Sequence, residues 1–484
     1  MPMISLSRII AFWADQQPGR VAIDHEGAQV TWAQLEARTN RLARAYEALG
    51  VGQDDFVTIA LPNGIAFIEA SLATWKLGAT PQPISAKLPK LERDQIVDLA
   101  KPALVVGCAP NEYATTPSVP ENFSPDASLS DAPLPERTAI SLKAMTSGGS
   151  TGRPKLIVSK APAAYDPDTP ILEIENQGVM LVPGPLYHNG PFLWAMYALF
   201  KGCTVAITTR FDAEQTLRTI ERLRVDTVYM VPTMMRRIWA LPEDVRQGFD
   251  LSSLRTLWHL AEPCPAWLKE RFIEWLGPSV IWELYGGTEG QGSTTIQGTD
   301  WLTHRGSVGK PVDTCEMKIV GETGETLPPG EIGEVYLRPL AGPGTTYRYL
   351  GATAKIIDGG WESLGDMGWM DADGFLYLAD RLSDMVIVGG ANIYPAEVEA
   401  ALDAFPGVRS SAVIGLPDDN TGNRLHAIID RPDGPVDEAT LLAHLGQHLV
   451  RYKTPRAFEW VNEPLRDEAG KVRRAALRKE RLAG

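Results

Sequence analysis

A run of ten residues in the first third of the chain combines glycines, hydroxyls and cations in a way that suits anion binding. The run reads Thr146-Ser147-Gly148-Gly149-Ser150-Thr151-Gly152-Arg153-Pro154-Lys155. Glycines bring backbone N–H groups close to an anion, hydroxyls donate to phosphate oxygens, and cations neutralise them. Because an apolar run (156–158) follows directly, we expect a loop between two strands. The spacing does not fit a Walker A loop, and a flexible polar surface loop is the alternative from composition alone.

Two later segments place a carboxylate close to glycine. Tyr285-Gly286-Gly287-Thr288-Glu289 follows a short apolar run and offers an aromatic face, a hydroxyl and a carboxylate that could hold Mg²⁺. Asp366 follows Gly365, and its two carboxylate oxygens match the paired hydroxyls of a ribose. Either segment by itself would be interpreted as a turn with a solvated acid.

These segments, with two more near the C-terminus, resemble the acyl-adenylate-forming superfamily of acyl-CoA synthetases, adenylation domains and luciferases. The usual phosphate loop reads Thr-Ser-Gly-Thr-Thr-Gly-x-Pro-Lys-Gly, so Gly149 replaces a hydroxyl residue and Leu156 replaces a glycine. Leu364 likewise replaces the threonine of the usual Thr-Gly-Asp. The matching segments occur in the family order between residues 146 and 474, and the chain is most like a carboxylic acid–CoA ligase.

The resemblance implies that ATP, Mg²⁺ and CoA are bound. Tyr285 would stack on adenine, Thr288 would bond the phosphates, and Glu289 would hold Mg²⁺. Asp366 would bind the ribose, and Arg381 the ribose or phosphates. The full set implied for ATP is Thr146, Ser147, Gly148, Gly149, Ser150, Thr151, Gly152, Lys155, Ala261, Glu262, Pro263, Tyr285, Gly286, Asp366 and Arg381.

Residues near the C-terminus resemble the family's mobile domain. Lys471 matches the near-terminal Gly-Lys and would touch the attacking carboxylate and the α-phosphate; for Arg473 and Arg474 an ordinary basic surface is preferred. Ser383 occupies the position of the domain pivot, which is usually Asp or Lys. The channel for the acceptor thiol would be lined by Gly389, Gly390 and Ala391.

The acyl pocket is implied by two segments. One contains Tyr187 and His188, of which His188 is the catalytic candidate, with an ordinary core or surface histidine as the alternative. The other contains Leu260, where the family usually has a small glycine. The candidate lining is Tyr187, His188, Trp194, Tyr229, Trp258, His259, Leu260 and Gly287. Large apolar residues are more often plain core, which is the alternative for the aromatic members.

Hydrophobic and charged shares of 44% and 22% in 484 residues indicate a globular protein with more than one domain. A net charge of −14 argues against nucleic-acid or anionic-membrane binding as the main task. No apolar run is long enough to cross a bilayer, and the first residues lack signal-peptide features. Cys108, Cys203, Cys264 and Cys315 form no pair motif, which suits a reducing cytoplasm and gives no zinc pattern.

Alternating strand and helix patterns predict an α/β fold with parallel doubly wound sheets. Thr31 and Gln34 form a capping box at a helix start. We expect a Pro- and Ser-rich surface loop over 109–135 and a small antiparallel sheet or barrel over 306–349. The large domain would span residues 1–381, and a small mobile α+β domain would span 382–484.

The predicted short elements are strands at 57–61, 104–106, 179–182, 204–207, 227–231, 316–320, 334–338, 412–416 and 425–429, and helices at 65–77 and 441–450.

The implied reaction has two steps. A carboxylate attacks the α-phosphate of Mg-ATP to give acyl-AMP and pyrophosphate, and after a domain rotation a thiol, preferably CoA, attacks the acyl-AMP. The aromatic candidates favour a bulky aromatic, alicyclic or other cyclic acid.

An amine acceptor, a carrier-protein thiol, a catalytically inactive ligand-binding relative and a luciferase-type oxygenation are the alternatives. The intact Lys471 and Glu289 speak against an inactive relative. Enzymes of this kind are often dimers, which leaves a homodimer open.

Overall fold

Local sequence signals set the start of helix α2 (Trp32–Ala48) in the computed structural model, which describes residues 3–148, 154–381, 384–388, 391–418, 421–467 and 470–483. The Thr31 hydroxyl accepts a hydrogen bond from the Gln34 N–H, and the Gln34 side chain accepts one from the Thr31 N–H. The predicted capping box is therefore confirmed. The buried face of α2 packs against α3 (Ile65–Lys76), which confirms the helix predicted at 65–77.

Four parallel strands form the N-terminal sheet in the order β5-β4-β6-β7. They are β4 (Phe56–Ile59), β5 (Thr80–Pro83), β6 (Leu104–Val106) and β7 (Ser118–Val119). The strands predicted at 57–61 and 104–106 are confirmed by β4 and β6. The stretch 109–135, which the structure describes in full, contains β7 as its one regular element, so the predicted loop is largely confirmed.

The phosphate loop joins two antiparallel strands, as predicted. Strand β8 (Ala144–Gly148) pairs with β9 (Pro154–Ser159), and β20 (Tyr347–Leu350) pairs with the other edge of β9. Ser147 and Lys155 are directly opposite each other in this register. The tip of the loop, which includes Gly149, Ser150, Thr151 and Gly152, lies outside the described residues.

The largest sheet has a parallel part with the strand order β2-β12-β11-β13-β14-β15. These strands are β2 (Val21–His25), β11 (Val179–Val182), β12 (Thr204–Ile207), β13 (Thr227–Met230), β14 (Thr256–Leu260) and β15 (Ile281–Gly286), with β3 (Ala28–Thr31) at the edge. The predictions at 179–182, 204–207 and 227–231 are thus confirmed.

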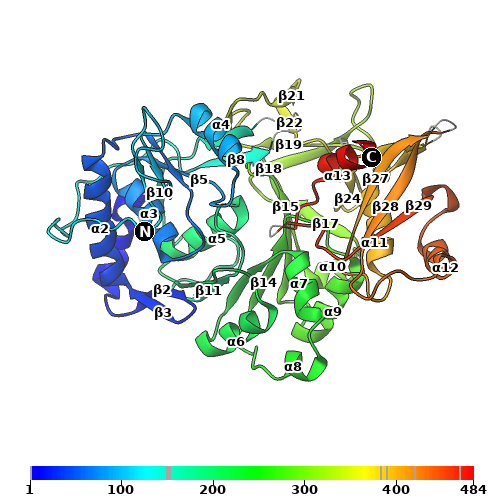
Figure 1. The fold of residues 1–484 in the computed structure, drawn as a ribbon, viewed down its shortest axis with the longest axis horizontal. Helices are drawn as coiled ribbons and strands as arrows, with labels where there is room; N and C mark the ends of the chain where they lie inside the picture. Colours follow the sequence, from blue (N-terminus) through cyan, green and yellow to red (C-terminus); the bar gives the residue numbers. More distant parts are fainter. Residues whose placement is uncertain are drawn as a thin grey trace.

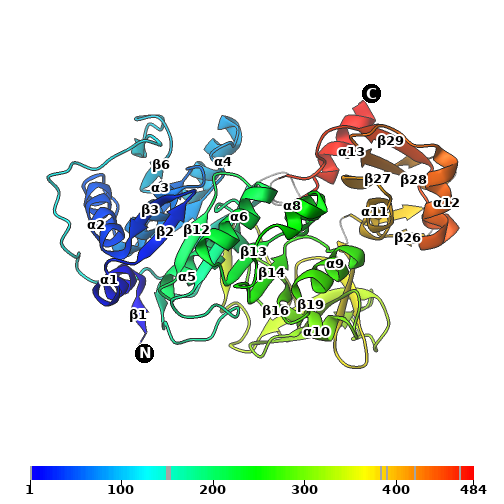
Figure 2. The same ribbon diagram turned by 90° about the horizontal axis from the view of Figure 1, so that it is seen from below.

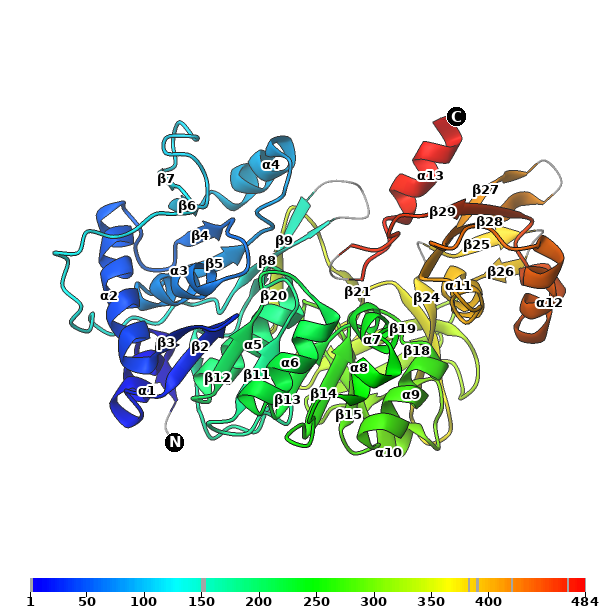
Figure 3. The same ribbon diagram turned by 60° about the horizontal axis from the view of Figure 1, so that its bottom comes forward.

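Helices cover both faces of this sheet. Strand β12 lies on one side of β11 and the next strand in the chain, β13, lies on the other. Right-handed crossovers therefore place α5 (Asn189–Phe200) on one face and α6 (Ala213–Leu223) on the other. Accordingly α5 contacts α1 (Leu6–Gln16) of the N-terminal layer. Helix α6 contacts α7 (Pro232–Trp239) and α8 (Glu243–Gln247), and α7 also contacts α9 (Ala266–Leu276) (Figure 3).

The antiparallel strands continue the parallel sheet. The chain turns back after residue 286, so β16 (Ser293–Gln297) pairs with β15 and extends the same hydrogen-bonded path. The predicted small antiparallel part is therefore joined to the parallel sheet by hydrogen bonds, and the strands predicted at 316–320 and 334–338 are confirmed. The further strands are β17 (Ser307–Pro311), β18 (Cys315–Val320), β19 (Gly333–Pro339), β21 (Lys355–Ile357), β22 (Trp361–Ser363), β23 (Asp366–Met370) and β24 (Leu376–Arg381).

A smaller C-terminal domain has its own apolar core, which runs from Val386 to Leu449, whereas the largest core of the N-terminal domain runs from Leu6 to Phe375. Orange and red in Figures 1 and 2 mark this domain beside the larger one. Strands β27 and β28 and helix α12 confirm the elements predicted near 412–416, 425–429 and 441–450. The expected boundary at residues 381 and 382 falls between the two cores and stays a prediction.

The elements of the C-terminal domain are β25 (Val386–Val388), β26 (Ala391–Ile393), α11 (Pro395–Asp403), β27 (Ser410–Asp418), β28 (Gly422–Asp430), α12 (Glu438–His448), the 3-10 helix Arg451–Lys453, β29 (Ala457–Val461) and α13 (Arg474–Ala483). The remaining elements are β1 (Ile4–Ser5), α4 (Lys90–Ala100), β10 (Ala164–Tyr165) and α10 (Gly298–Trp301). No helix in the described part of the chain has both the length and the apolarity to cross a bilayer.

A buried ion pair attaches α9 to the sheet. Lys269 Nζ of α9 lies 2.6 Å from Glu283 Oε2 of β15, and both side chains are buried. His259 Nε2 of β14 lies 3.9 Å from the same oxygen. Burial, together with the Lys269 charge, holds the pKa of His259 well below its ordinary value. A neutral histidine and a paired carboxylate therefore fill the space between α9 and these strands.

We expect Lys269→Met to lower the free energy of unfolding by about 3 kcal/mol, because Glu283 would keep a buried charge without its counter-ion. Chemical denaturation followed by tryptophan fluorescence measures the change. Arg271→Met is the matched control: Arg271 on the same helix pairs with Glu274 at an exposed site, and such pairs contribute about 1 kcal/mol or less. Equal losses in both variants would contradict a structural role for the buried pair.

Candidate active site

The expected site segments follow the carboxyl ends of neighbouring parallel strands. The pair Tyr187 and His188 comes after β11, and His188 is the N-cap residue of α5. Glu262 follows β14, and Glu289 follows β15. Because the carboxyl ends of parallel strands meet at one edge of a sheet, the strand order alone brings these segments together.

Glu289 joins the phosphate loop to this edge. Its Oε1 atom accepts a hydrogen bond of 2.6 Å from the Tyr349 hydroxyl and lies 3.4 Å from Lys155 Nζ. Lys155 Nζ also donates to the Tyr349 hydroxyl at 3.1 Å. Burial and the Glu289 hydrogen bond raise the pKa of Tyr349, which keeps it a donor. Mg²⁺ is usually held by one or two carboxylates together with substrate phosphates, so a buried carboxylate beside a phosphate-loop lysine fits this ion.

Tyr285 and Asp366 are brought together from different parts of the sheet. The Tyr285 hydroxyl donates to Asp366 Oδ2 at 2.8 Å. Asp366 opens β23 and is directly opposite Arg381 of β24 in the antiparallel register. Tyr285 and Asp366, which are expected to bind adenine and ribose, are therefore neighbours. The backbone of Arg381, the expected ribose or phosphate ligand, is adjacent to Asp366.

Contacts with Leu364 and Gln82 support two of the expected nucleotide segments. A Cβ atom at Gly287 would lie 2.4 Å from Leu364 Cδ1, so the leucine that replaces the usual threonine packs on this glycine. Thr146, on the neighbouring strand β8, accepts a hydrogen bond of 2.8 Å from Gln82 Nε2 of β5. The N-terminal sheet thus supports the start of the phosphate loop.

Lys143 is a buried cation at the junction of three site segments, and it was not among the predicted residues. Its Nζ donates to Asn189 Oδ1, next to His188, and lies 3.5 Å from the backbone oxygen of Thr288. Burial lowers the pKa of Lys143 to about 8, and the Glu289 charge opposes that shift. A lysine directly before the strand that leads to the phosphate loop was the signal that could have identified it.

Three of the aromatic acyl-pocket candidates, Trp194, Tyr229 and Trp258, form one contiguous group. The ring of Trp194 lies 5.4 Å from Tyr229 and 6.1 Å from Trp258, and all three side chains are buried. A Cβ atom at Gly190 would lie 2.5 Å from the Tyr229 hydroxyl oxygen, so the first turn of α5 packs closely on this ring. Tyr187 and His188 are in contact at a ring distance of 4.3 Å.

His259 is not brought together with this group. Side chains alternate along a strand, so Trp258 and Leu260 face α5 while His259 faces α9 and contacts Glu283. Leu260 is buried on the same face as Trp258.

The C-terminal domain reaches the site through the segment before Lys471. A Cβ atom at Gly470 would lie 2.4 Å from Glu262 Cδ, which places this glycine directly on the expected adenine segment. Glu262 is itself anchored, because its carboxylate accepts hydrogen bonds from the Thr233 N–H at 2.5 Å and the Thr233 hydroxyl at 3.0 Å at the start of α7. Ala261 and Pro263 on either side are exposed.

The hinge and channel residues are only partly described. Ser383, Gly389 and Gly390 lie outside the described residues. Ala391 is described and pairs with Val388 in the β25–β26 hairpin.

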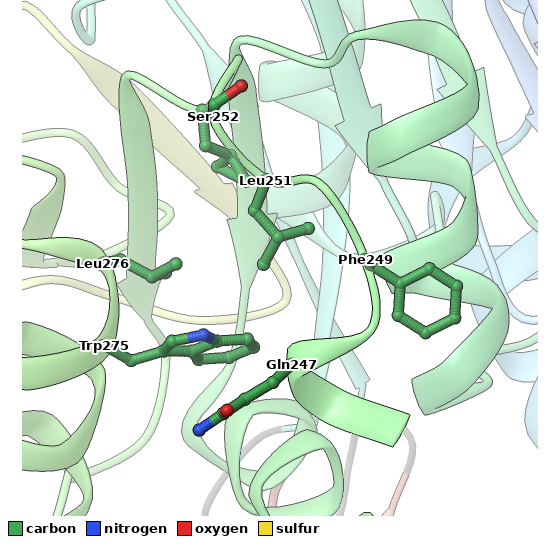
Figure 4. Close-up of a pocket in the computed structure, with 7 residues that line it drawn as sticks. Gln247, Phe249, Leu251, Ser252, Trp275 and Leu276 are labelled. Atoms are coloured by element: carbon green, nitrogen blue, oxygen red, sulfur yellow. The ribbon is translucent and has the colours of Figure 1, made fainter. Parts of the chain in front are cut away.

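A separate surface pocket of about 450 Å³ lies at the opposite end of β14 (Figure 4). It is lined by residues that precede β14, such as Phe249 and Leu251, and by Trp275 near the end of α9. None of the predicted site residues lines this pocket.

The lowered pKa of Lys143 gives a pH-dependent stability. Between about pH 8 and 10.5 the folded state binds fewer protons than the unfolded state, so stability rises with pH across that window. We therefore expect the free energy of unfolding of the wild type to rise relative to Lys143→Met over this range, by at most about 1.4 kcal/mol per pH unit. Denaturation at several pH values measures it, with Lys160→Met as the charge-loss control. A constant difference would contradict the lowered pKa of Lys143.

The family model of the AMP-binding enzyme matches residues 10–350, and that of the AMP-binding enzyme C-terminal domain matches residues 397–471. Feruloyl-CoA synthase from an Amycolatopsis species is 33% identical, covering 96% of this chain and 97% of the relative.

Solved structures agree with these matches. o-Succinylbenzoate CoA synthetase from Bacillus subtilis, in complex with its acyl-adenylate intermediate, superposes with a TM-score of 0.83 at 26% identity over 99% and 98% of the two chains. Its complex with ATP and magnesium ion gives 0.82 at 25% identity over 98% and 100%. The amide bond synthetase from Marinactinospora thermotolerans gives 0.81 at 26% identity over 98% and 99%. The chain therefore belongs to the AMP-binding enzyme family, with both the large domain and the C-terminal domain of that family.

Proposed function

We propose that this protein is an AMP-forming acid–thiol ligase that converts a carboxylic acid into its CoA thioester. The observation that carries the proposal is the packing of Gly470, the residue before Lys471, on Glu262 at the carboxyl edge of the sheet. This packing puts the residue before Lys471, in the C-terminal domain, against the segment of the large domain that would border adenine. Two relatives support this proposal. One is named a feruloyl-CoA synthase, and the solved o-succinylbenzoate CoA synthetase contains its acyl-adenylate intermediate.

In the first step a carboxylate oxygen of the acid attacks the α-phosphorus of ATP. The bond to the β-phosphate oxygen breaks, and pyrophosphate leaves with acyl-AMP retained. Lys155 and Glu289, with Mg²⁺, would hold the leaving phosphates, and Lys471 would offset the charge that builds on the α-phosphate. The neighbouring Tyr285 and Asp366 would hold adenine and ribose.

In the second step the sulfur of CoA attacks the acyl carbon, AMP leaves with the electron pair of the broken C–O bond, and the thiol proton is released. Ser383 would lie at the pivot between the two steps, with the segment Gly389 to Ala391 along the path of the thiol. We also propose that Arg381 and Thr288 contact the nucleotide and that His188 lies at the carboxylate of the acid.

We propose an aromatic or other cyclic acid as the substrate. Trp194, Tyr229 and Trp258 are packed in the apolar core, and their rings would stack on a cyclic acid that entered beside them. Trp194 Nε1 is buried and, within the described ranges, has no hydrogen-bond partner, so an oxygen on the ring of a bound acid would satisfy it. The feruloyl and o-succinylbenzoate relatives act on acids of this type.

An amide synthetase is the second candidate, because the amide bond synthetase superposes as well as the CoA ligases. A carrier-protein thiol is a further acceptor with the same first step. Mass spectrometry of one pooled reaction distinguishes these: purified protein, Mg-ATP, CoA and a panel of aromatic, alicyclic and fatty acids. A mass that matches an acyl-CoA supports the ligase. Acyl-AMP that accumulates without thioester would favour the amine or carrier acceptor.

We also propose a cytoplasmic homodimer. Cys108, Cys203, Cys264 and Cys315 are free thiols, which suits a reducing compartment. Light scattering of the purified protein measures the oligomeric state.

Lys471→Ala should lower the rate of adenylation by about 10²-fold or more, because one electrostatic contact to the transition state is worth roughly 3–4 kcal/mol. Acid-dependent pyrophosphate release measures it. The exposed neighbour Arg473 provides the control, and Arg473→Ala should keep the rate within about twofold. Near-normal pyrophosphate release from Lys471→Ala would remove this lysine from the catalytic group.

A further inference from the structure

The Arg466 side chain lies between buried carboxylates of the two domains. Its Nη1 is 3.6 Å from Glu262 Oε2 in the large domain, and its Nη2 is 3.4 Å from Glu399 Oε2 of α11 in the C-terminal domain. The side chains of Glu262 and Glu399 are 5% and 4% exposed. One guanidinium therefore supplies positive charge to two acids that water scarcely reaches.

Both carboxylates depend on this charge. Burial raises the pKa of Glu262, and Arg466 is the largest influence that lowers it. Glu399 has a second cation, because Arg474 Nη2 donates to Glu399 Oε2 at 2.7 Å. Within the described part of the chain, Glu262 otherwise accepts hydrogen bonds from Thr233, and the charge of Arg236 makes a smaller contribution that also lowers its pKa. Arg466 is thus more important to Glu262 than to Glu399.

The same guanidinium holds the residue before Lys471. Arg466 Nη1 donates to the Gly470 backbone oxygen at 3.1 Å. Gly470 has φ +79°, and a Cβ atom there would lie 2.4 Å from Glu262 Cδ. A side chain at residue 470 would therefore prevent this close approach. Asp467 supports the same turn, because the Lys471 N–H donates to Asp467 Oδ1 at 3.0 Å.

We propose that Arg466 is a positioning residue for adenylation: by joining Glu262 to the Gly470 oxygen, it holds the Gly470–Lys471 segment on the nucleotide side of the large domain. This inference rests on the proposed function, since it assigns Arg466 to the step in which Lys471 acts. The contact of Lys471 with the reacting atoms then depends on an ion pair between domains. Thioester formation from acyl-AMP that is already made does not use Lys471 and should not need Arg466.

A second ion pair between the domains provides a matched control. Arg236 Nη1 of α7 donates to Asp403 Oδ2 of α11 at 2.8 Å, and both side chains are largely buried. This pair joins the same two domains. Arg236 is on α7, whose first turn binds Glu262, and Asp403 is on α11, which carries Glu399. Among the described residues, Arg236 donates hydrogen bonds to Asp403 and to the Arg409 backbone oxygen, and its charge lowers the pKa of Glu262 less than the charge of Arg466 does. Arg236→Gln therefore weakens domain contact and leaves the Lys471 turn intact.

The experiment separates the two half-reactions of the full-length protein. Acid-dependent pyrophosphate release with Mg-ATP measures adenylation. Acyl-CoA formation from CoA and chemically prepared acyl-AMP of the same acid measures the second step. Wild-type protein is assayed first, because a failure to release pyrophosphate with every acid would count against the proposed function and not against the role of Arg466.

We expect Arg466→Gln to lower the kcat of pyrophosphate release by about 10-fold to 10²-fold, the loss typical of a catalytic group displaced by about 1 Å. Its KM for ATP and its rate of thioester formation should stay within about threefold of wild type. Arg236→Gln should change neither half-reaction by more than about threefold. Equal losses of adenylation in Arg466→Gln and Arg236→Gln would overturn the proposal, because general domain contact would then explain both.

A double-mutant cycle tests whether Arg466 acts through Glu262. If Arg466 acts through Glu262, the double variant Glu262→Gln with Arg466→Gln should adenylate no more slowly than the slower single variant. Multiplied losses would overturn the coupling. Loss of both half-reactions in Arg466→Gln would also overturn the proposal, because Arg466 would then support the fold and not the position of Lys471.

Discussion

The geometry of the parallel sheet is the constraint on which the site depends. Strands β11, β13, β14 and β15 are neighbours, and the carboxyl ends of β11, β14 and β15 lead into segments that carry candidate site residues. The side chains that follow must therefore meet at one edge of the sheet. The hairpin of β8 and β9 reaches this edge from the other side, where Lys155 and Tyr349 contact Glu289. Any change in strand order would separate these groups.

The buried charges on and around β14 and β15 have named partners. Lys269 of α9 neutralises Glu283 of β15, and Arg466 of the C-terminal domain lies against Glu262. Lys143 differs, because its nearest partners are the neutral oxygens of Asn189 and Thr288. A buried ammonium with neutral partners loses its proton more readily, which explains the lowered pKa. Polar contacts of this kind require a unique arrangement of the segments that they join.

The site is divided between two domains. The large domain holds the segments that would bind ATP and the acid, and the C-terminal domain contributes the turn before Lys471. Two ion pairs, from Arg236 and Arg466, join the domains in the observed orientation. A site assembled across two separately packed cores can be completed or opened by moving one core, which suits a reaction with two different nucleophiles.

Short-range patterns determined much of this protein. The Thr31–Gln34 capping box, the short apolar strands and the position of the phosphate loop between two strands depend on residues a few positions apart, and the structure has them as predicted. The motif residues Tyr285 and Asp366 were identified from the sequence, although their hydrogen bond spans 81 positions. Only the tertiary structure placed Lys143 on Asn189, Tyr349 on Glu289 and Arg466 on Glu262, and joined the antiparallel strands to the parallel sheet. The physical reason is that local conformation follows from neighbouring side chains and backbone, whereas contacts between distant residues follow from strand order and domain packing.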